Sequence, residues 1–104
     1  MTYIDDLASL IRSCLPASAE PPEDSDGLFR IYAVLLRAKG EQVTDEDVHD
    51  AWSAWMGSVD DTHTALVPFH DLDPETRAFD APYAMAIRAA ARQEGAAQRR
   101  SAQT

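Results

Sequence analysis

Histidines with acidic neighbours are the residues of this sequence best suited to metal chemistry. His49 and His70 are each followed by an aspartate, Asp50 and Asp71, and such pairs are typical of metal phosphohydrolases of the HD type. A site of that type needs further metal ligands from several helices. Its helical shell is also larger than a chain of 104 residues can form. The two pairs therefore do not predict a phosphohydrolase, and we expect neither a metal nor another cofactor.

Other reactive groups lack the partners that catalysis requires. His63 with Asp60 and Asp61 could form a metal cluster, but adjacent aspartates near a turn more often cap a helix or lie in a solvated loop. Ser53 has no base placed for it, and no G-x-S-x-G motif occurs. The glycines are scattered at expected helix ends and form no phosphate-binding loop. We therefore expect a protein that is not an enzyme.

The charge and the cysteine usage narrow the possible partners and compartments. A net charge of −9 and a pI near 4.5 argue against binding to nucleic acid or to an anionic membrane, which both require clustered basic residues. Cys14 is alone, so no intramolecular disulfide is possible, and helical spacing predicts a buried thiol there. The acidic start of the chain is unlike a signal peptide, and we expect a cytoplasmic protein.

Apolar periodicity predicts an all-α fold, with a single domain of about five helices over residues 1–95. The first helix should span residues 3–15 after a cap at Thr2. The second, residues 28–39, is apolar nearly all round and should be the buried centre of the fold. The third should follow a cap at Thr44 and end at Gly57. Its hydrophobic staple would be Val43 with Val48.

Residues 62–83 are too irregular for one helix, and they contain the apolar tetrad LVPF, a short extended loop at residues 66–69. We expect this tetrad to anchor the segment in the core. Asp73 followed by Pro74 predicts the start of a short helix. Asp80 should then cap a last helix over residues 81–93, and residues 96–104 should be a disordered tail.

Residues 43–92 resemble the ryanodine receptor repeat, or RyR domain, in a small bacterial or phage version with one copy. The resemblance begins with His49 and Trp52, which match a His-x-x-Trp helix motif. A loop motif and a third motif are matched by His63, Leu66, Val67, Pro68 and Phe69, and then by Leu72, Arg77 and Asp80. The resemblance implies a small helical module that binds an adenine nucleotide and that acts in conflict between bacteria and phages.

The ligand site implied by the resemblance has Trp52 as its aromatic wall. The complete set of site residues expected from it is Leu36, His49, Trp52, Met56, His63 and Asp80. Met56 and Ala65 stand where the family would place basic residues, so a triphosphate should fit poorly and an adenosine-like ligand better. The alternative is that His63 and Asp80 merely cap turns in a scaffold without a ligand.

The resemblance therefore implies a non-enzymatic binding module for a nucleotide-like small molecule. The alternative function is an adaptor between proteins, whose acidic surface would meet a basic partner. The receptors carry the repeat in two copies, and this chain carries one. Either its own N-terminal helices or a second chain must replace the missing copy, and we expect a homodimer.

Overall fold

The computed structural model describes the backbone of residues 2–102 and the side chains of residues 2–99. The first helix, α1, spans Tyr3–Cys14 and begins as its sequence predicts. Thr2 and Asp5 form a reciprocal capping box, in which the Thr2 hydroxyl accepts from the Asp5 backbone N–H. The helix buries Leu7, Ala8 and Ile11 and packs on α2 and α5. Cys14, at the end of this helix, is half-buried and accepts a hydrogen bond from the Gln93 amide.

The second helix, α2 (Asp26–Lys39), is central, because it contacts α1, α3 and α5. Its buried face carries Leu28, Phe29, Tyr32, Ala33 and Leu36. Burial is nevertheless one-sided, since Val34 is exposed on the opposite face. Gly40 ends the helix with a positive φ of 55°, a conformation that costs other residues free energy, and a 3₁₀ turn, η1 (Gly40–Gln42), follows.

The third helix, α3 (Asp45–Val59), starts at the predicted cap. Thr44 and Asp47 form a second capping box, while Val43 and Val48 are both buried next to it. The helix passes through Gly57 and ends two residues later than the sequence predicts. Gly57 does not adopt the positive φ that a glycine uses to terminate a helix.

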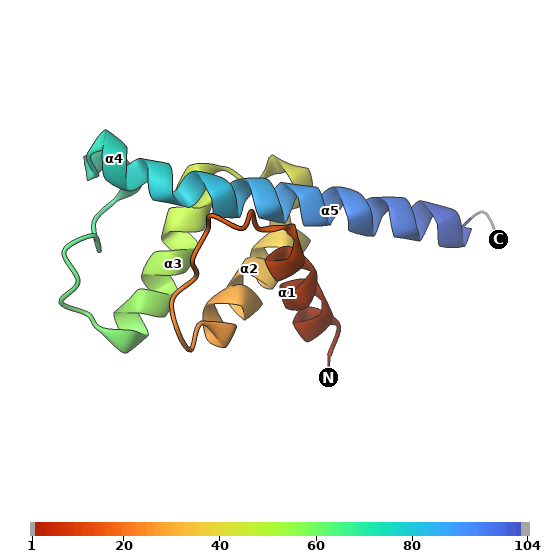
Figure 1. Ribbon diagram of the computed structural model, residues 1–104, viewed down its shortest axis with the longest axis horizontal. Coiled ribbons are helices and arrows are strands. Elements are labelled where there is room, and N and C mark those ends of the chain that lie inside the picture. Colours follow the sequence, from red (N-terminus) through yellow and green to blue (C-terminus); the bar gives the residue numbers. More distant parts are fainter. Residues whose placement is uncertain (1, 103–104) are drawn as a thin grey trace.

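A segment that we call the strap, residues 60–72, connects α3 to the C-terminal helices (Figure 1). It contains a 3₁₀ turn, η2 (Phe69–Asp71), and leads to the short helix α4 (Pro74–Arg77). Asp73 caps α4 through the Thr76 backbone N–H, and Pro74 occupies its first position, as predicted. A third 3₁₀ turn, η3 (Ala78–Asp80), joins α4 to the last helix.

The last helix, α5 (Ala81–Ala102), lies across α1, α2 and α3 and extends beyond them at its C-terminal end (Figure 1). Ala84, Ala86, Ile87 and Ala90 form its buried face. The expected stop near Gln93 does not occur, so residues 96–102, expected to be disordered, are helical. Residues 103–104 of the expected tail lie outside the described residues. Alanine, arginine and glutamine, which are strong helix formers, dominate this end of the chain.

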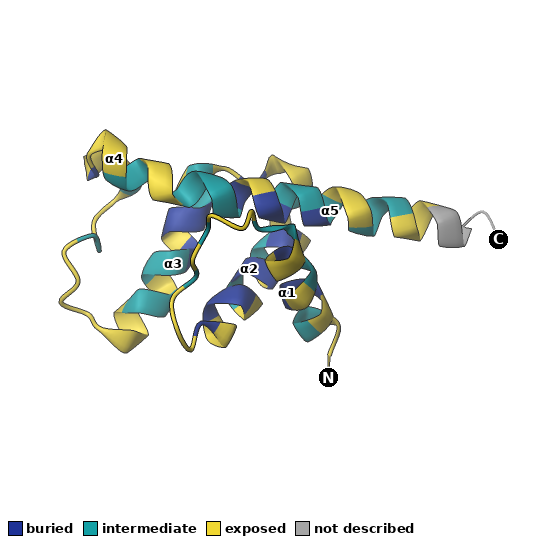
Figure 2. Ribbon diagram, viewed as in Figure 1, coloured by how far each residue is buried: buried dark blue, intermediate teal, exposed yellow. Residues whose placement is uncertain are grey.

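One hydrophobic core unites these helices, and the fold is all-α as predicted, with no strand in the described part of the chain. Its fully buried large side chains include Tyr32, Phe29, Ile11 and Ile87. Figure 2 places the buried residues where α1, α2 and α3 meet α5, and most of the strap is exposed. No described helix has the length and apolarity needed to cross a membrane.

Candidate functional site

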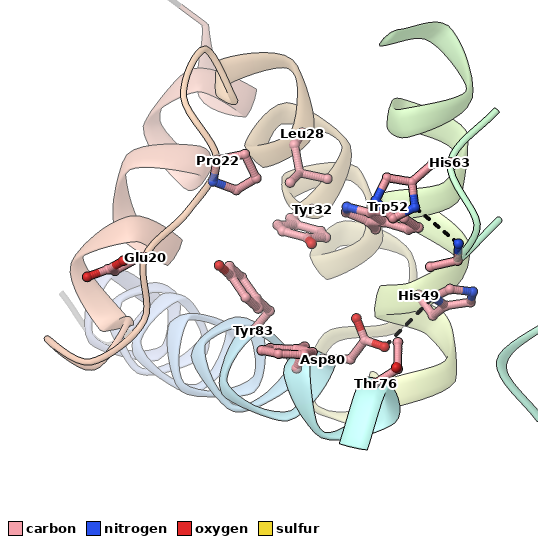
Figure 3. A pocket seen from close by; sticks show the side chains of 12 residues that line it. Glu20, Pro22, Leu28, Tyr32, His49, Trp52, His63, Thr76, Asp80 and Tyr83 are labelled. Carbon is pink, nitrogen blue, oxygen red and sulfur yellow. Dashed lines mark hydrogen bonds and ion pairs between the residues drawn. The ribbon is translucent and has the colours of Figure 1, made fainter. Parts of the chain in front are cut away.

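A pocket of about 360 Å³ opens between α2, α3, α4, η3, the start of α5 and two connecting segments (Figure 3). Its lining residues are Glu20, Pro22, Leu28, Tyr32, His49, Trp52, His63, Ala65, Thr76, Phe79, Asp80 and Tyr83. The volume lies near the lower end of the roughly 300–1,000 Å³ found for ligand pockets. The cavity is therefore large enough for a compact small molecule.

Tyr32 and Tyr83 make one continuous aromatic wall of the pocket. Their ring centroids are 5.9 Å apart, and Phe29 extends the same cluster into the core at 5.5 Å from Tyr32. Burial raises the pKa of both tyrosine hydroxyls, and the nearby Asp80 carboxylate raises them further. Both hydroxyls therefore remain protonated near neutral pH and can donate hydrogen bonds.

Trp52 forms a second aromatic surface of the pocket, on α3. The imidazole of His49 stacks on its indole with centroids 5.6 Å apart, and the ring of His63 meets it edge-on at 5.0 Å. His63 itself is exposed, on the strap. Its Nδ1 atom accepts from the Ala65 backbone N–H at 3.1 Å, so the neutral ring carries its proton on Nε2. Nε2 is then a donor at the edge of the pocket.

His49 is 3% exposed and has polar neighbours on both ring nitrogens. Nε2 lies 2.6 Å from the backbone carbonyl oxygen of Val67, and Nδ1 lies 3.8 Å from the Asp80 carboxylate (Figure 3). A carbonyl oxygen can only accept, so Nε2 must donate and the neutral ring has no proton on Nδ1. His49 thus ties the strap to α3 and turns Nδ1 toward Asp80.

Asp80 is one of two acids that line the pocket, the other being Glu20, and its side chain is only 14% exposed. Burial raises the pKa of this carboxyl to about 6, although the nearby His49 opposes the shift and Asp45 adds to it. No side-chain or backbone donor of the described residues lies within hydrogen-bonding distance of its oxygens. Asp80 therefore accepts no hydrogen bond from the described residues, and its nearest ionisable partner is the Nδ1 atom of His49 at 3.8 Å.

Asp80 does not cap α5, contrary to the sequence prediction. Ala78 and Ala81 both have helical φ and ψ, so the backbone passes from α4 through η3 into α5 without leaving the helical region. An N-cap residue needs an extended backbone to direct its side chain at the following N–H groups. This continuity leaves the carboxyl free to face His49.

Charge and ligand types also limit what the pocket can hold. Among the residues described, neither lysine nor arginine lines it, while Glu20 and Asp80 do. No three metal-ligating side chains in the described part of the chain are grouped closely enough to hold a metal ion. The described lining is therefore aromatic and acidic.

Comparison with known proteins identifies the family. Residues 2–92 match the family described as Domain of unknown function (DUF7701). The chain belongs to the DUF7701 family. Neither a curated protein nor a solved structure matches it.

The resemblance to the ryanodine receptor repeat is wrong, since the DUF7701 match covers the whole segment and no match to that repeat accompanies it. Its motifs are short, and the most specific of them is not placed as the resemblance implies. In this DUF7701 chain the LVPF tetrad is not a core anchor, because Val67 is 38% exposed and Pro68 is exposed as well. The strap is held by the Val67 carbonyl group and by Leu72, which is buried.

The six expected site residues separate into two groups. His49, Trp52, His63 and Asp80 line the same pocket. Leu36 does not, because it is buried in the core between helices, and Met56 is not among the lining residues either.

The sequence reading missed Tyr32 and Tyr83 as site residues. Tyr83 lies three positions after Asp80, which places both on one helical face, so its position could have been found. Tyr32 comes from α2, and no local pattern connects it to His49 or Asp80. Glu20 and Pro22 lie in an acidic, proline-rich connection that reads as a solvated loop.

Proposed function

We propose that this protein is a non-enzymatic binding module for a small, flat nitrogen heterocycle of the nucleobase or nucleoside type. The observation that carries the proposal is one pocket lined by Trp52, Tyr32 and Tyr83 together with Asp80, whose carboxyl accepts no hydrogen bond from the described residues. Aromatic walls favour a flat ring, and a few convergent polar groups fix its orientation. A role in conflict between bacteria and phages rested on the resemblance alone and is not part of the proposal.

The acidic lining favours a nucleoside over a nucleotide. Phosphate groups need basic side chains or helix N-termini to offset their charge, and Glu20 and Asp80 would instead repel them. The lining also lacks an activated nucleophile, because Ser53 meets His49 only at 3.4 Å through the nitrogen that already donates to Val67. This arrangement supports binding without turnover.

The experiment is a thermal-shift screen with adenosine, cytidine, guanosine, uridine and ATP at millimolar concentration. A ligand that binds only the folded state raises the melting temperature. We expect at least one nucleoside to raise the melting temperature of the wild type and not that of Trp52→Ala. We expect ATP to raise the melting temperature of the wild type by less. Failure of every nucleoside to shift the wild type would contradict the proposal.

A second candidate function, an adaptor for a basic partner, has one observation in its favour. Four of the basic side chains already pair with acids of the same chain, in Arg12–Asp26, Arg30–Asp5, Lys39–Asp47 and Arg92–Glu41. The net charge is −9, so the remaining acidic side chains make the surface negatively charged. An adaptor of this kind should bind a lysine-rich probe peptide at low salt and release it at about 0.3 M salt.

A further inference from the structure

We infer that Asp80 makes the pocket selective for flat cations that present two adjacent N–H donors, the pattern of an amidinium or a protonated aminoheterocycle. This inference rests on the proposed function and specifies the ligand class for the same pocket. It follows from three features of the pocket. Asp80 accepts no hydrogen bond from the described residues, the aromatic side chains have a particular arrangement, and few basic groups lie nearby.

The first step concerns the bonding that Asp80 lacks. An ionised carboxylate has two acceptor oxygens and no donor, and the described protein groups give it no hydrogen bond. His49 is the nearest cationic candidate, yet its Nδ1 atom is 3.8 Å away. Because Nε2 holds its proton against the Val67 carbonyl group, a neutral His49 presents only a lone pair to Asp80. A ligand with N–H donors could donate hydrogen bonds to the Asp80 oxygens and to the Nδ1 lone pair of His49.

The second step concerns shape. Tyr32 and Tyr83 have ring centroids 5.9 Å apart and form one wall of the pocket. The third aromatic group, Trp52, is already contacted by the rings of His49 and His63, so the three do not form an open aromatic cage. A round alkylammonium ion is best held by aromatic rings on several sides. A flat ring instead stacks on one aromatic surface while its edge reaches a hydrogen-bonding group. Tyr83 and Asp80 line the same pocket, and the Asp80 carboxylate is near enough to raise the pKa of the Tyr83 hydroxyl, which suits the second arrangement.

The third step concerns charge. Charge-assisted bonds between a carboxylate and paired N–H donors are about twice as strong as neutral ones, and a bidentate pair also fixes orientation. The ionisable groups that face Asp80 from the surrounding elements are His49, Asp45, Tyr32, Tyr83, His63 and Glu20. The tyrosines remain neutral, and two of the others are acids. A ligand cation therefore meets no lysine or arginine charge among the described lining residues.

The predicted pH dependence follows with a definite sign. Asp80 has a raised pKa of about 6, so its carboxylate forms as the pH rises through that value. An amidinium remains charged throughout this range. Its affinity should therefore increase between pH 5 and pH 7.5, whereas that of a neutral amide should change little.

The test uses benzamidine, its neutral isostere benzamide, and choline as a cation that is not flat. Affinities for the whole chain are measured by calorimetric titration at pH 7.5 in the wild type, in Asp80→Asn and in Asp50→Asn. Asp50 is an exposed acid of α3 outside the pocket, so its variant changes the net charge equally. We expect benzamidine to bind the wild type and Asp50→Asn roughly tenfold or more tightly than benzamide, and Asp80→Asn to lose that preference.

Three results would overturn the inference. They are equal binding of benzamidine and benzamide by the wild type, a preference that survives in Asp80→Asn, and choline binding as tight as that of benzamidine. The rise of wild-type benzamidine affinity from pH 5 to pH 7.5 provides a second test that needs no variant. If nucleosides bind while benzamidine shows no preference, the inference fails and the proposed function stands. If neither nucleosides nor these probes bind, both fail.

Discussion

The Nε2 atom of His49 lies 2.6 Å from the backbone carbonyl oxygen of Val67, and this contact joins α3 to the middle of the strap. The two residues are 18 positions apart, and the histidine side chain is buried while the valine is exposed. Two pocket residues, His63 and Ala65, lie on the strap just before Val67. This hydrogen bond therefore helps to position this side of the pocket, together with buried Leu72 and the contact of His63 with Trp52.

Replacing His49 by phenylalanine should loosen the strap, because the ring keeps its stacking on Trp52 but cannot donate to Val67. Losing a buried hydrogen bond costs about 1–3 kcal/mol when the partner stays unsatisfied. The backbone amides of Leu66, Asp71 and Leu72 are hydrogen-bonded within the strap, so their hydrogen exchange reports its opening. We expect them to exchange roughly tenfold faster, as measured by NMR.

The matched control is His70→Phe, which changes an exposed histidine of the strap that faces Glu46 at 3.3 Å. This pair lies at the surface and should contribute less than about 1 kcal/mol. Exchange at the strap amides should be close to that of the wild type. Equal acceleration in both variants would mean that His49 does not hold the strap.

Asp80→Asn should stabilise the protein above pH 6 and leave it unchanged near pH 4. The folded pKa of about 6 lies above the ordinary value of 3.8, so between these values the folded state binds the proton more tightly than the unfolded state. The contribution of Asp80 to stability therefore falls as the pH rises from 4 to 6 and stays low above 6. Allowing for screening by solvent at the open pocket, we expect the variant to gain about 1–2 kcal/mol at pH 7.5 in urea unfolding.

Asp73→Asn provides the control of opposite sign. The Thr76 backbone N–H holds the pKa of Asp73 below its usual value, so this carboxylate stabilises the fold above the ordinary pKa and loses that effect as the pH falls. Its replacement should be neutral or slightly destabilising at pH 7.5. If Asp80→Asn behaves in the same direction as Asp73→Asn, the carboxyl of Asp80 is not destabilised by burial.

Local patterns in the sequence were sufficient to predict three of the helix starts. Thr2, Thr44 and Asp73 each act on residues within three positions, and all three cap the helices expected of them. Helix ends were less predictable. The third helix was expected to end at Gly57 and the last helix near Gln93. Gly57 does not adopt a positive φ, and tertiary packing and strong helix formers carry both helices further.

The candidate site was predictable only in part, because its geometry depends on contacts between distant residues. His49 and Trp52 stand on one helix, so their proximity follows from spacing. The bond from His49 to Val67 involves a backbone oxygen, which carries no signature in the sequence. Leu36 was placed in the pocket by the resemblance, whereas the packing of α2 turns it into the core.

Leu36→Ala should therefore act through stability and not through a ligand. Truncating a buried leucine removes transfer free energy and leaves a cavity, at a cost of about 2–5 kcal/mol. Met56→Ala, on a half-buried side chain outside the pocket, should cost about 1 kcal/mol or less. For any nucleoside found in the screen, calorimetry at a temperature where both variants are folded should give wild-type affinity. A tenfold loss in either variant would place that residue at the site after all.

The homodimer expected from the sequence stays a prediction. Phe79 is 75% exposed and Met85 is 61% exposed, and exposed apolar side chains of this size are candidates for a contact between copies. Light scattering at micromolar concentration and moderate salt should give twice the chain mass of 11.4 kDa, and Phe79→Asp should reduce it. The mass of one chain at every concentration would rule the dimer out.

Two variants of Trp52 should distinguish its contribution to stability from its contribution to ligand binding. Its indole is half-buried and stacks on His49, so Trp52→Ala removes both packing and the aromatic surface of the pocket. We expect a loss of up to about 3–5 kcal/mol in unfolding free energy and no measurable nucleoside binding. Trp52→Phe keeps an aromatic ring on the same helix but has less area for stacking. It should stay folded and weaken nucleoside binding roughly tenfold by calorimetry, whereas lower stability with unchanged affinity would remove Trp52 from the binding site.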